Sequence, residues 1–305
     1  MIVATDYERL RESVGLVDRS TRGKLRLTGA EAAEFLQGQV TNDVEALRPG
    51  TGCYAALLTH KGKMLADMRI LRGPDWIWID CEPSSVAAIE RNVRTYSIGR
   101  DVQFEDVTAA HAILSLIGPE ARDRLDAPPA AGEHAFVSGE HGLYVATDLG
   151  IDVICPAEEA EATSEALGVE AVGEEAAECV RIESGRPRFG LDIGPETIPE
   201  EAGLNERAVS FTKGCYVGQE TVARLHYKGK PNRHLRGLQL SEAADRGAEI
   251  TLGDRAVGEV GSAAVSPVHG PIALAVVRRE AAPGERVKIG SAGADAVVTA
   301  LPFSK

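Results

Sequence analysis

Residues 213–220 read KGCYVGQE, and this segment differs in charge from the rest of the chain. Between Lys213 and Arg236 there are six Lys or Arg residues and one carboxylate, Glu220, which gives a local charge of +5. The whole chain of 305 residues has 33 Lys and Arg against 46 Asp and Glu, a net charge of −13. A basic segment gathers anions against the repulsion of an acidic chain. The sequence therefore predicts a local anion site and does not favour nucleic acid as a general partner.

Cys215 lies at the centre of this basic segment. Nearby cations favour the thiolate, which is the nucleophilic form of cysteine. Gly214 and Gly218 allow the backbone to turn tightly around it. We therefore expect Cys215 to be a reactive thiol that Lys213 tunes or guards. The alternative is a glycine-rich turn with a buried cysteine and solvent-facing charges.

The remaining composition is typical of a folded protein, with 44% apolar and 26% charged residues. The apolar run at 272–277 is far shorter than the roughly 20 residues of a membrane span. Charged residues interrupt the first ten positions, so we expect no secretory signal, no membrane partner and a cytoplasmic location. The five cysteines include no C-x-x-C pair, so no metal site is predicted, and motifs of NTPases, dinucleotide enzymes, zincins and α/β-hydrolases are absent.

Hydrophobic patterning predicts an α+β fold. Strands are expected at 24–28, 54–59, 64–71 and 76–80, with a capping box at 28–31 that starts a helix. In the strand 64–71, Asp67 and Arg69 share one face, where Arg69 could neutralise Asp67. From residue 234 onward short alternating runs are separated by glycines, which is typical of a small barrel. The predicted division is 1–105, an N-terminal α/β part; 106–230, a second α/β part that ends in the KGCYVGQE loop; and 231–305, a C-terminal β-barrel.

The octapeptide resembles the K-G-C-[YF]-[IV]-G-Q-E signature of the YgfZ-type folate-binding proteins, relatives of the glycine-cleavage T-protein (aminomethyltransferase). The resemblance extends over nearly the whole chain. Residues 35–43 are similar to the family's F-L-Q-x-x-x-T-N-D stretch, residues 54–69 to its hairpin, and residues 181–204 to its R-x-E-x-G…P-x-E…L stretch. The octapeptide with its cysteine is the specific part, since both branches share the others.

This resemblance implies an aminomethyltransferase-like, clover-leaf arrangement around a central folate channel, with residues 1–105 as the folate-binding part and tetrahydrofolate or a one-carbon derivative as cofactor. Asp67 matches the second member of an Asp-Asp pair in the aminomethyltransferases. Glu183 is expected near the pterin end, where a carboxylate can accept paired N–H bonds. Asn42 is expected either to contact folate through its amide or to cap a helix. Arg236 is expected to meet the acidic glutamate tail of a folate.

Two positions depart from the aminomethyltransferase pattern. Ala66 replaces the first aspartate of the pair, and Cys215 replaces a usual acidic residue before an aromatic. Losing a carboxylate removes one way of orienting the amine and the folate N5 region. The resemblance therefore favours a tetrahydrofolate-binding accessory factor for assembly or repair of iron–sulfur enzymes, including those that modify tRNA, with Cys215 as the functional thiol and iron–sulfur proteins or assembly factors as partners.

Two alternatives remain open at this level. The first is an aminomethyltransferase that moves a one-carbon unit from a carrier-bound amine to tetrahydrofolate, so the sequence leaves open whether the protein is an enzyme. The second is a module that binds RNA or an acidic protein through residues 213–236. We expect no direct nucleic-acid binding, because the global charge opposes it.

Overall fold

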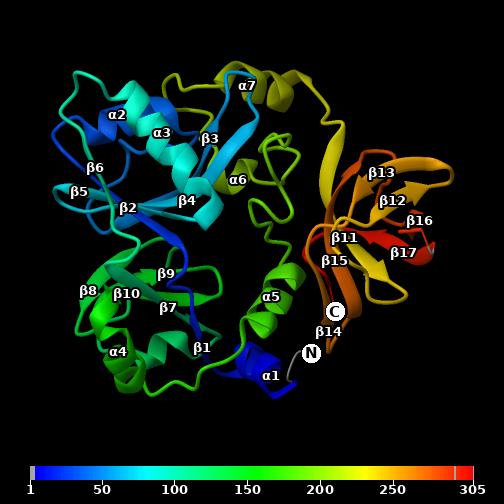
Figure 1. The fold of residues 1–305 in the computed structure, drawn as a ribbon, viewed down its shortest axis with the longest axis horizontal. Coiled ribbons are helices and arrows are strands. Elements are labelled where there is room, and N and C mark those ends of the chain that lie inside the picture. The colour runs from blue at the N-terminus through cyan, green and yellow to red at the C-terminus, as the bar shows by residue number, and fades with distance from the viewer. Residues whose placement is uncertain (1–3, 292, 305) are drawn as a thin grey trace.

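The computed structural model describes residues 4–291 and 293–304. Three antiparallel sheets form its framework, and an irregular segment that carries α5, α6 and α7 runs between them (Figure 1). The predicted α+β class and the barrel-like last third are confirmed.

The first sheet has the strand order β3-β4-β5-β2-β6, and two helices cover one of its faces. Its elements are β2 (Gly23–Thr28), α2 (Ala32–Gln39), β3 (Thr51–Leu58), β4 (Met64–Arg72), β5 (Trp76–Cys81), the short η1 (Pro83–Ser85), α3 (Val86–Tyr96) and β6 (Gln103–Asp106). In β4, Ala66, Met68 and Ile70 are buried in the core beneath the helices. Asp67 and Arg69 alternate with them and lie on the opposite face, as the pattern predicts.

The helix α2 starts differently from the prediction. It begins at Ala32 with Glu31 at its N-cap, and no side chain caps it. The carboxylate of Glu31 instead accepts the backbone N–H of Asp101 at 2.7 Å. The predicted capping box is therefore wrong, because a long-range contact uses the glutamate that a local cap would need.

The second sheet has the order β1-β7-β10-β9-β8. Its elements are β1 (Gly15–Asp18), β7 (His111–Ile117), η2 (Ala121–Arg124), β8 (Phe136–Gly139), β9 (Gly142–Ala146), β10 (Gly150–Pro156), η3 (Ala157–Glu159) and α4 (Ala160–Leu167). Side chains of both sheets, among them Leu71, Trp78, Phe136 and Ile154, share one small core between them. β1 pairs with β7, so residues 15–18 belong to the second sheet although they precede the whole first sheet in sequence. The second sheet therefore contains residues from both sides of the predicted boundary at 105/106.

The third sheet is curled, with the order β13-β12-β16-β17-β11-β15-β14 (Figure 1). Its strands are β11 (Arg233–Leu240), β12 (Glu249–Leu252), β13 (Arg255–Glu259), β14 (Ala263–Ser266), β15 (Gly270–Arg278), β16 (Arg286–Ile289) and β17 (Ala294–Thr299). Contacts between β13 and β15 bring the two sides of the curl together around an apolar core. The result is a half-barrel, with no helix among its described residues.

Helices α1 (Ala4–Glu12) and α5 (Glu174–Glu183) pack against each other. α5 also contacts β14, so it links the second sheet to the half-barrel (Figure 1). The chain then continues through α6 (Asn205–Ala208) and α7 (Gln219–Lys228). None of the helices in the described part of the chain has the length and apolar character to cross a membrane.

Candidate functional site

Residues of the octapeptide 213–220 attach this part of the chain to the first sheet and to the loop 37–42. The Lys213 ammonium donates to the carbonyl oxygens of Gln37 at 2.6 Å, Val40 at 2.8 Å and Asn42 at 2.7 Å. Burial lowers the pKa of Lys213 to about 8. All three ammonium protons are directed at residues 37–42, so the prediction that Lys213 tunes Cys215 is corrected: the lysine holds the 37–42 loop.

Tyr216 and Gly218 complete this attachment. Tyr216 is buried, with the Lys213 ammonium 5.2 Å from its ring centre. Gly218 has φ +87°, and a Cβ there would lie 2.6 Å from the Thr59 carbonyl oxygen at the β3–β4 turn. Only glycine fits that conformation and that approach. At Gly214, by contrast, an added Cβ would meet no atom within 4 Å. The expectation that the backbone requires glycine therefore holds at Gly218 and not at Gly214.

Cys215 is exposed. Among the described residues no hydrogen bond or ion pair joins its thiol to Lys213 or to another predicted site residue. The other four cysteines lie inside the protein: Cys81, Cys155 and Cys179 are buried and Cys53 is partly buried.

Asn42 is joined to Lys213 through its own carbonyl, and its side chain is engaged by the backbone. The amide donates to the carbonyls of Tyr54 at 2.8 Å and Arg207 at 3.1 Å, and its oxygen accepts the N–H of Asp43 at 2.9 Å. The expected helix cap is wrong, because no helix in the described part of the chain begins beside Asn42, and the expected folate contact stays a prediction. Asn42 fixes β3 relative to α6.

Asp67, on β4 of the first sheet, is a buried carboxylate with a raised pKa. It is 4% exposed, and the Tyr54 hydroxyl donates to it at 2.5 Å. Burial raises the pKa of Asp67 to about 6, although the Tyr54 hydrogen bond and the charge of Arg22 act in the opposite direction. A carboxyl with this pKa can exchange a proton near neutral pH.

Arg69 does not neutralise Asp67, contrary to the expectation from the strand pattern. Its guanidinium binds Asp80 at 2.7 Å and Asp152 at 2.6 Å. Asp152 lies in β10, so this contact joins the two five-stranded sheets. The partner of Arg69 is thus set by the packing of sheets and not by the neighbour on its own strand.

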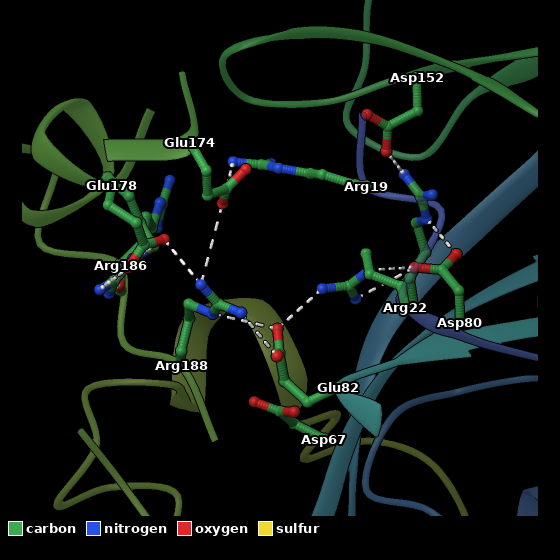
Figure 2. A network of polar contacts seen from close by, with 12 residues as sticks. Arg19, Arg22, Asp67, Asp80, Glu82, Asp152, Glu174, Glu178, Arg186 and Arg188 are labelled. Atoms are coloured by element: carbon green, nitrogen blue, oxygen red, sulfur yellow. Dashed lines mark hydrogen bonds and ion pairs between the residues drawn. The ribbon is translucent and has the colours of Figure 1, made fainter. Parts of the chain in front are cut away.

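A network of ion pairs lies beside Asp67 (Figure 2). Glu82 binds Arg22 at 2.9 Å and Arg188 at 2.8 Å, and Arg188 also reaches Glu178 of α5 at 2.9 Å. Asp67 lies next to Glu82 in this view and takes no part in the dashed contacts. The network borders a cavity of about 340 Å³ whose lining residues are Asp18, Arg19, Thr21, Arg22, Glu82, Glu174, Glu178, Arg181 and Arg188.

Arg207 lies over the ring of Tyr54. Its guanidinium carbon is 5.1 Å from the centre of the Tyr54 ring, and it forms an ion pair with Glu133. Tyr54, Glu82, Arg188 and Arg207 were not identified from the sequence. The hairpin register contained a signal for Tyr54, because Ala56 pairs with Asp67 and places residue 54 diagonally beside it on the same face.

Glu183 and Arg236 lie away from Asp67. Glu183, 5% exposed, accepts hydrogen bonds from the hydroxyls of Tyr7 at 2.9 Å and Ser266 at 2.5 Å, and so links α1 and β14 to α5. Arg236 has no ion pair within the part of the chain that the structure describes, and its Nε is buried without a hydrogen-bond partner. Burial lowers the pKa of Arg236. The structure therefore brings Lys213 and Asn42 together, but among residues 4–291 and 293–304 no hydrogen bond or ion pair joins Asp67, Glu183 and Arg236 to one another.

Comparisons with known proteins agree with this architecture. Residues 1–135 match the GCVT N-terminal domain, and residues 233–305 match the glycine cleavage T-protein C-terminal barrel domain. A probable aminomethyltransferase of Natronomonas pharaonis is 30% identical over 99% of this chain and 90% of its own length. An aminomethyltransferase of Nostoc sp. is 28% identical over 94% of this chain and 82% of its own.

Among solved structures, the glycine cleavage system aminomethyltransferase T from Bartonella henselae has a TM-score of 0.88. It is 24% identical and covers 98% of this chain and 89% of its own, which establishes the shared fold.

These findings overturn the prediction of an accessory factor for iron–sulfur enzymes. Relatives matched over nearly the entire chain are named aminomethyltransferases, and the solved neighbour has the same name. The two departures at Ala66 and Cys215 were given too much weight, because they are single positions in a chain that is similar throughout. With matching domains at both ends and a 30% identical relative along 99% of its length, this chain belongs to the glycine cleavage T-protein family of aminomethyltransferases.

Proposed function

We propose that this protein is a tetrahydrofolate-dependent aminomethyltransferase, which moves a one-carbon unit from an amine on a carrier protein to tetrahydrofolate. The observation that carries the proposal is the buried Asp67 carboxyl with its Tyr54 partner. A buried carboxyl whose pKa is about 6 suits proton transfer, and it lies on the strand where the resemblance expects the conserved acid of the family.

The reaction needs two protons to be moved. The carrier holds the carbon between a sulfur and an amino group. Bonds from this carbon to nitrogen and to sulfur break, and bonds to N5 and N10 of the folate form. The two N–H protons of the folate end on the released ammonia and on the freed thiol, so atoms balance and no oxidant is needed. In this proposal Asp67 accepts one of these protons and passes it on.

Tyr54 orients the carboxylate of Asp67, because its hydroxyl donates a short hydrogen bond to one oxygen. The other predicted contacts remain part of the proposal: Glu183 for the pterin ring and Arg236 for the tail carboxylates. Arg236 suits this role because its guanidinium has no ion-pair partner among the described residues. Lys213 and Asn42 act indirectly, by holding the loop 37–42 and β3 in place.

The octapeptide resembles the YgfZ-type branch of this superfamily, and assignment to that branch is likewise a proposal. The role of Cys215 as a functional thiol stays a prediction. Its exposure leaves the sulfur accessible, but the transfer described here uses no thiol of this chain.

The test is a transfer assay on the whole protein. It contains tetrahydrofolate, the aminomethyl-loaded lipoylated carrier and one of three proteins: the natural chain, Asp67→Asn or Asp75→Asn. Asp75 is an exposed aspartate directly before β5, and it makes no hydrogen bond or ion pair with the described residues, so it is a matched control. We expect methylene-tetrahydrofolate and ammonia from the natural chain and from Asp75→Asn, and a loss of about 100-fold or more in Asp67→Asn. No turnover by the natural chain with the complete set of glycine-cleavage partners would refute the proposal.

A further inference from the structure

A second cavity lies between the two five-stranded sheets, away from the ion-pair network. It has a volume of about 270 Å³ and is lined mainly by Trp76, Trp78, His111, Leu143 and Ile154. These residues come from β5, β7, β9 and β10. Small-molecule sites are commonly apolar cavities of about this size or somewhat larger, with a few polar groups that fix orientation.

Two aromatic side chains of its wall contact each other. Trp78 is 6% exposed, and its ring meets that of His111 edge to face at 5.1 Å. The indole Nε1 of Trp78 and the Nδ1 of His111 are buried and have no hydrogen-bond partner among the described residues. Because both nitrogens are shielded, a ligand in the cavity would contact the rings of this pair and not their nitrogens.

Arg26 provides a positive charge at the same cavity. It lines the cavity and is exposed, and it lies directly across from Trp78 in the β2–β5 pairing. Its other neighbour across β2 is Glu105, but no carboxylate among the described residues is within ion-pair distance of Arg26. In a chain with a net charge of −13, an arginine without a partner beside two indoles is a site for an anion.

We propose that this cavity binds a small aromatic carboxylate. The ring would lie among the indole rings and the apolar side chains, and the carboxylate would accept from Arg26 at the edge of the cavity. This site is separate from Asp67. Trp78 pairs with Leu71 in β4, four residues beyond Asp67, which is a separation of about 13 Å along the strand.

The chain contains its own reporter for this site, because Trp76 and Trp78 are its two tryptophans. Benzoate is the probe. Benzamide tests the need for the charge, and acetate tests the need for the ring. We expect a saturable change in tryptophan emission with benzoate, at least tenfold weaker binding of benzamide, and no saturable change with acetate at the same concentrations.

Variants separate a built site from general adsorption. Arg26→Gln should weaken benzoate binding about tenfold. Arg91 is an exposed arginine on α3 that forms no ion pair with any residue the structure describes, and Arg91→Gln should leave benzoate binding unchanged. Trp78→Phe should also weaken it while Trp76 continues to report. An absent saturable signal, equal affinity for benzoate and benzamide, or equal affinity in the Arg26→Gln and Arg91→Gln proteins would overturn the proposal.

The result is independent of the transferase proposal. Asp67→Asn should bind benzoate as the natural chain does, and Arg26→Gln should keep the natural rate of one-carbon transfer. Loss of benzoate binding in Asp67→Asn would place the probe in the folate site and would overturn a separate cavity.

Discussion

Replacing Asp67 by Asn should make the protein more stable at neutral pH while it removes transfer activity. The pKa of Asp67 is raised by burial from 3.8 to about 6. Each unit of difference between folded and unfolded states corresponds to about 1.4 kcal/mol, so keeping this carboxylate charged in the folded protein costs about 3 kcal/mol at pH 7.5. Asparagine has nearly the same shape and no charge, and it can still accept the Tyr54 hydrogen bond.

The sign of the pH dependence follows from proton uptake. Between about pH 4 and pH 6 the folded state holds the Asp67 proton more tightly than the unfolded state does. The favourable contribution of Asp67 is therefore complete below pH 4 and is lost as the pH rises through 6. The stability difference between Asp67→Asn and the natural chain should be near zero at pH 4 and reach about 3 kcal/mol at pH 7.5.

The assay is a thermal unfolding series from pH 4 to pH 8 on the natural chain, Asp67→Asn and Asp75→Asn. A gain of about 3 kcal/mol corresponds to about 5 °C in the unfolding midpoint for a chain of this size. Asp75→Asn should follow the natural chain at every pH. A lower midpoint for Asp67→Asn at pH 7.5, or a gain that persists unchanged at pH 4, would refute the reasoning that burial strains the charged form.

Three further outcomes follow from the site. Tyr54→Phe removes the hydrogen bond that favours the charged carboxylate, so the pKa of Asp67 should rise above 6 and the acidic limb of the kcat/KM profile should move to higher pH; an unchanged limb would exclude Asp67 as the titrating base. Lys213→Met leaves three carbonyl oxygens without their donor and should destabilise the fold by about 3 kcal/mol or more in denaturant unfolding, whereas Lys61→Met at an exposed position should not. Gly218→Ala should cost about 1–3 kcal/mol because of its positive φ and the Thr59 carbonyl, while Gly214→Ala should be close to neutral; equal effects would show that the close approach is unimportant.

The sequence was sufficient where the signal was local. Alternation along β4 placed Asp67 opposite the core face, and short runs separated by glycines identified the strands of the half-barrel. Both inferences depend on the period of a single strand, which neighbours in sequence determine.

The sequence was insufficient where a side chain chooses a distant partner. Lys213 reaches residues 37–42 rather than Cys215 two positions away, and Arg69 reaches Asp152 across two sheets rather than Asp67 on its own strand. Charge patterning identifies which residues are ionised, but it contains no information about how sheets are placed relative to each other. The iron–sulfur prediction is wrong for a related reason, because it depends on Cys215 and its neighbours in sequence, whereas the similarity to aminomethyltransferases extends over nearly the whole chain.

The properties of Asp67 depend on which carboxylates the surrounding arginines bind. Arg69 is held by Asp80 and Asp152, and Arg22 is held by Asp80 and Glu82. A direct ion pair with any arginine would lower the pKa of Asp67 and leave it permanently charged. Because other carboxylates take these guanidinium groups, a neutral tyrosine is the side-chain donor that reaches Asp67. The ion pairs that join the sheets thereby also keep this carboxyl near the point of titration, which couples the assembly of the fold to the chemistry proposed for it.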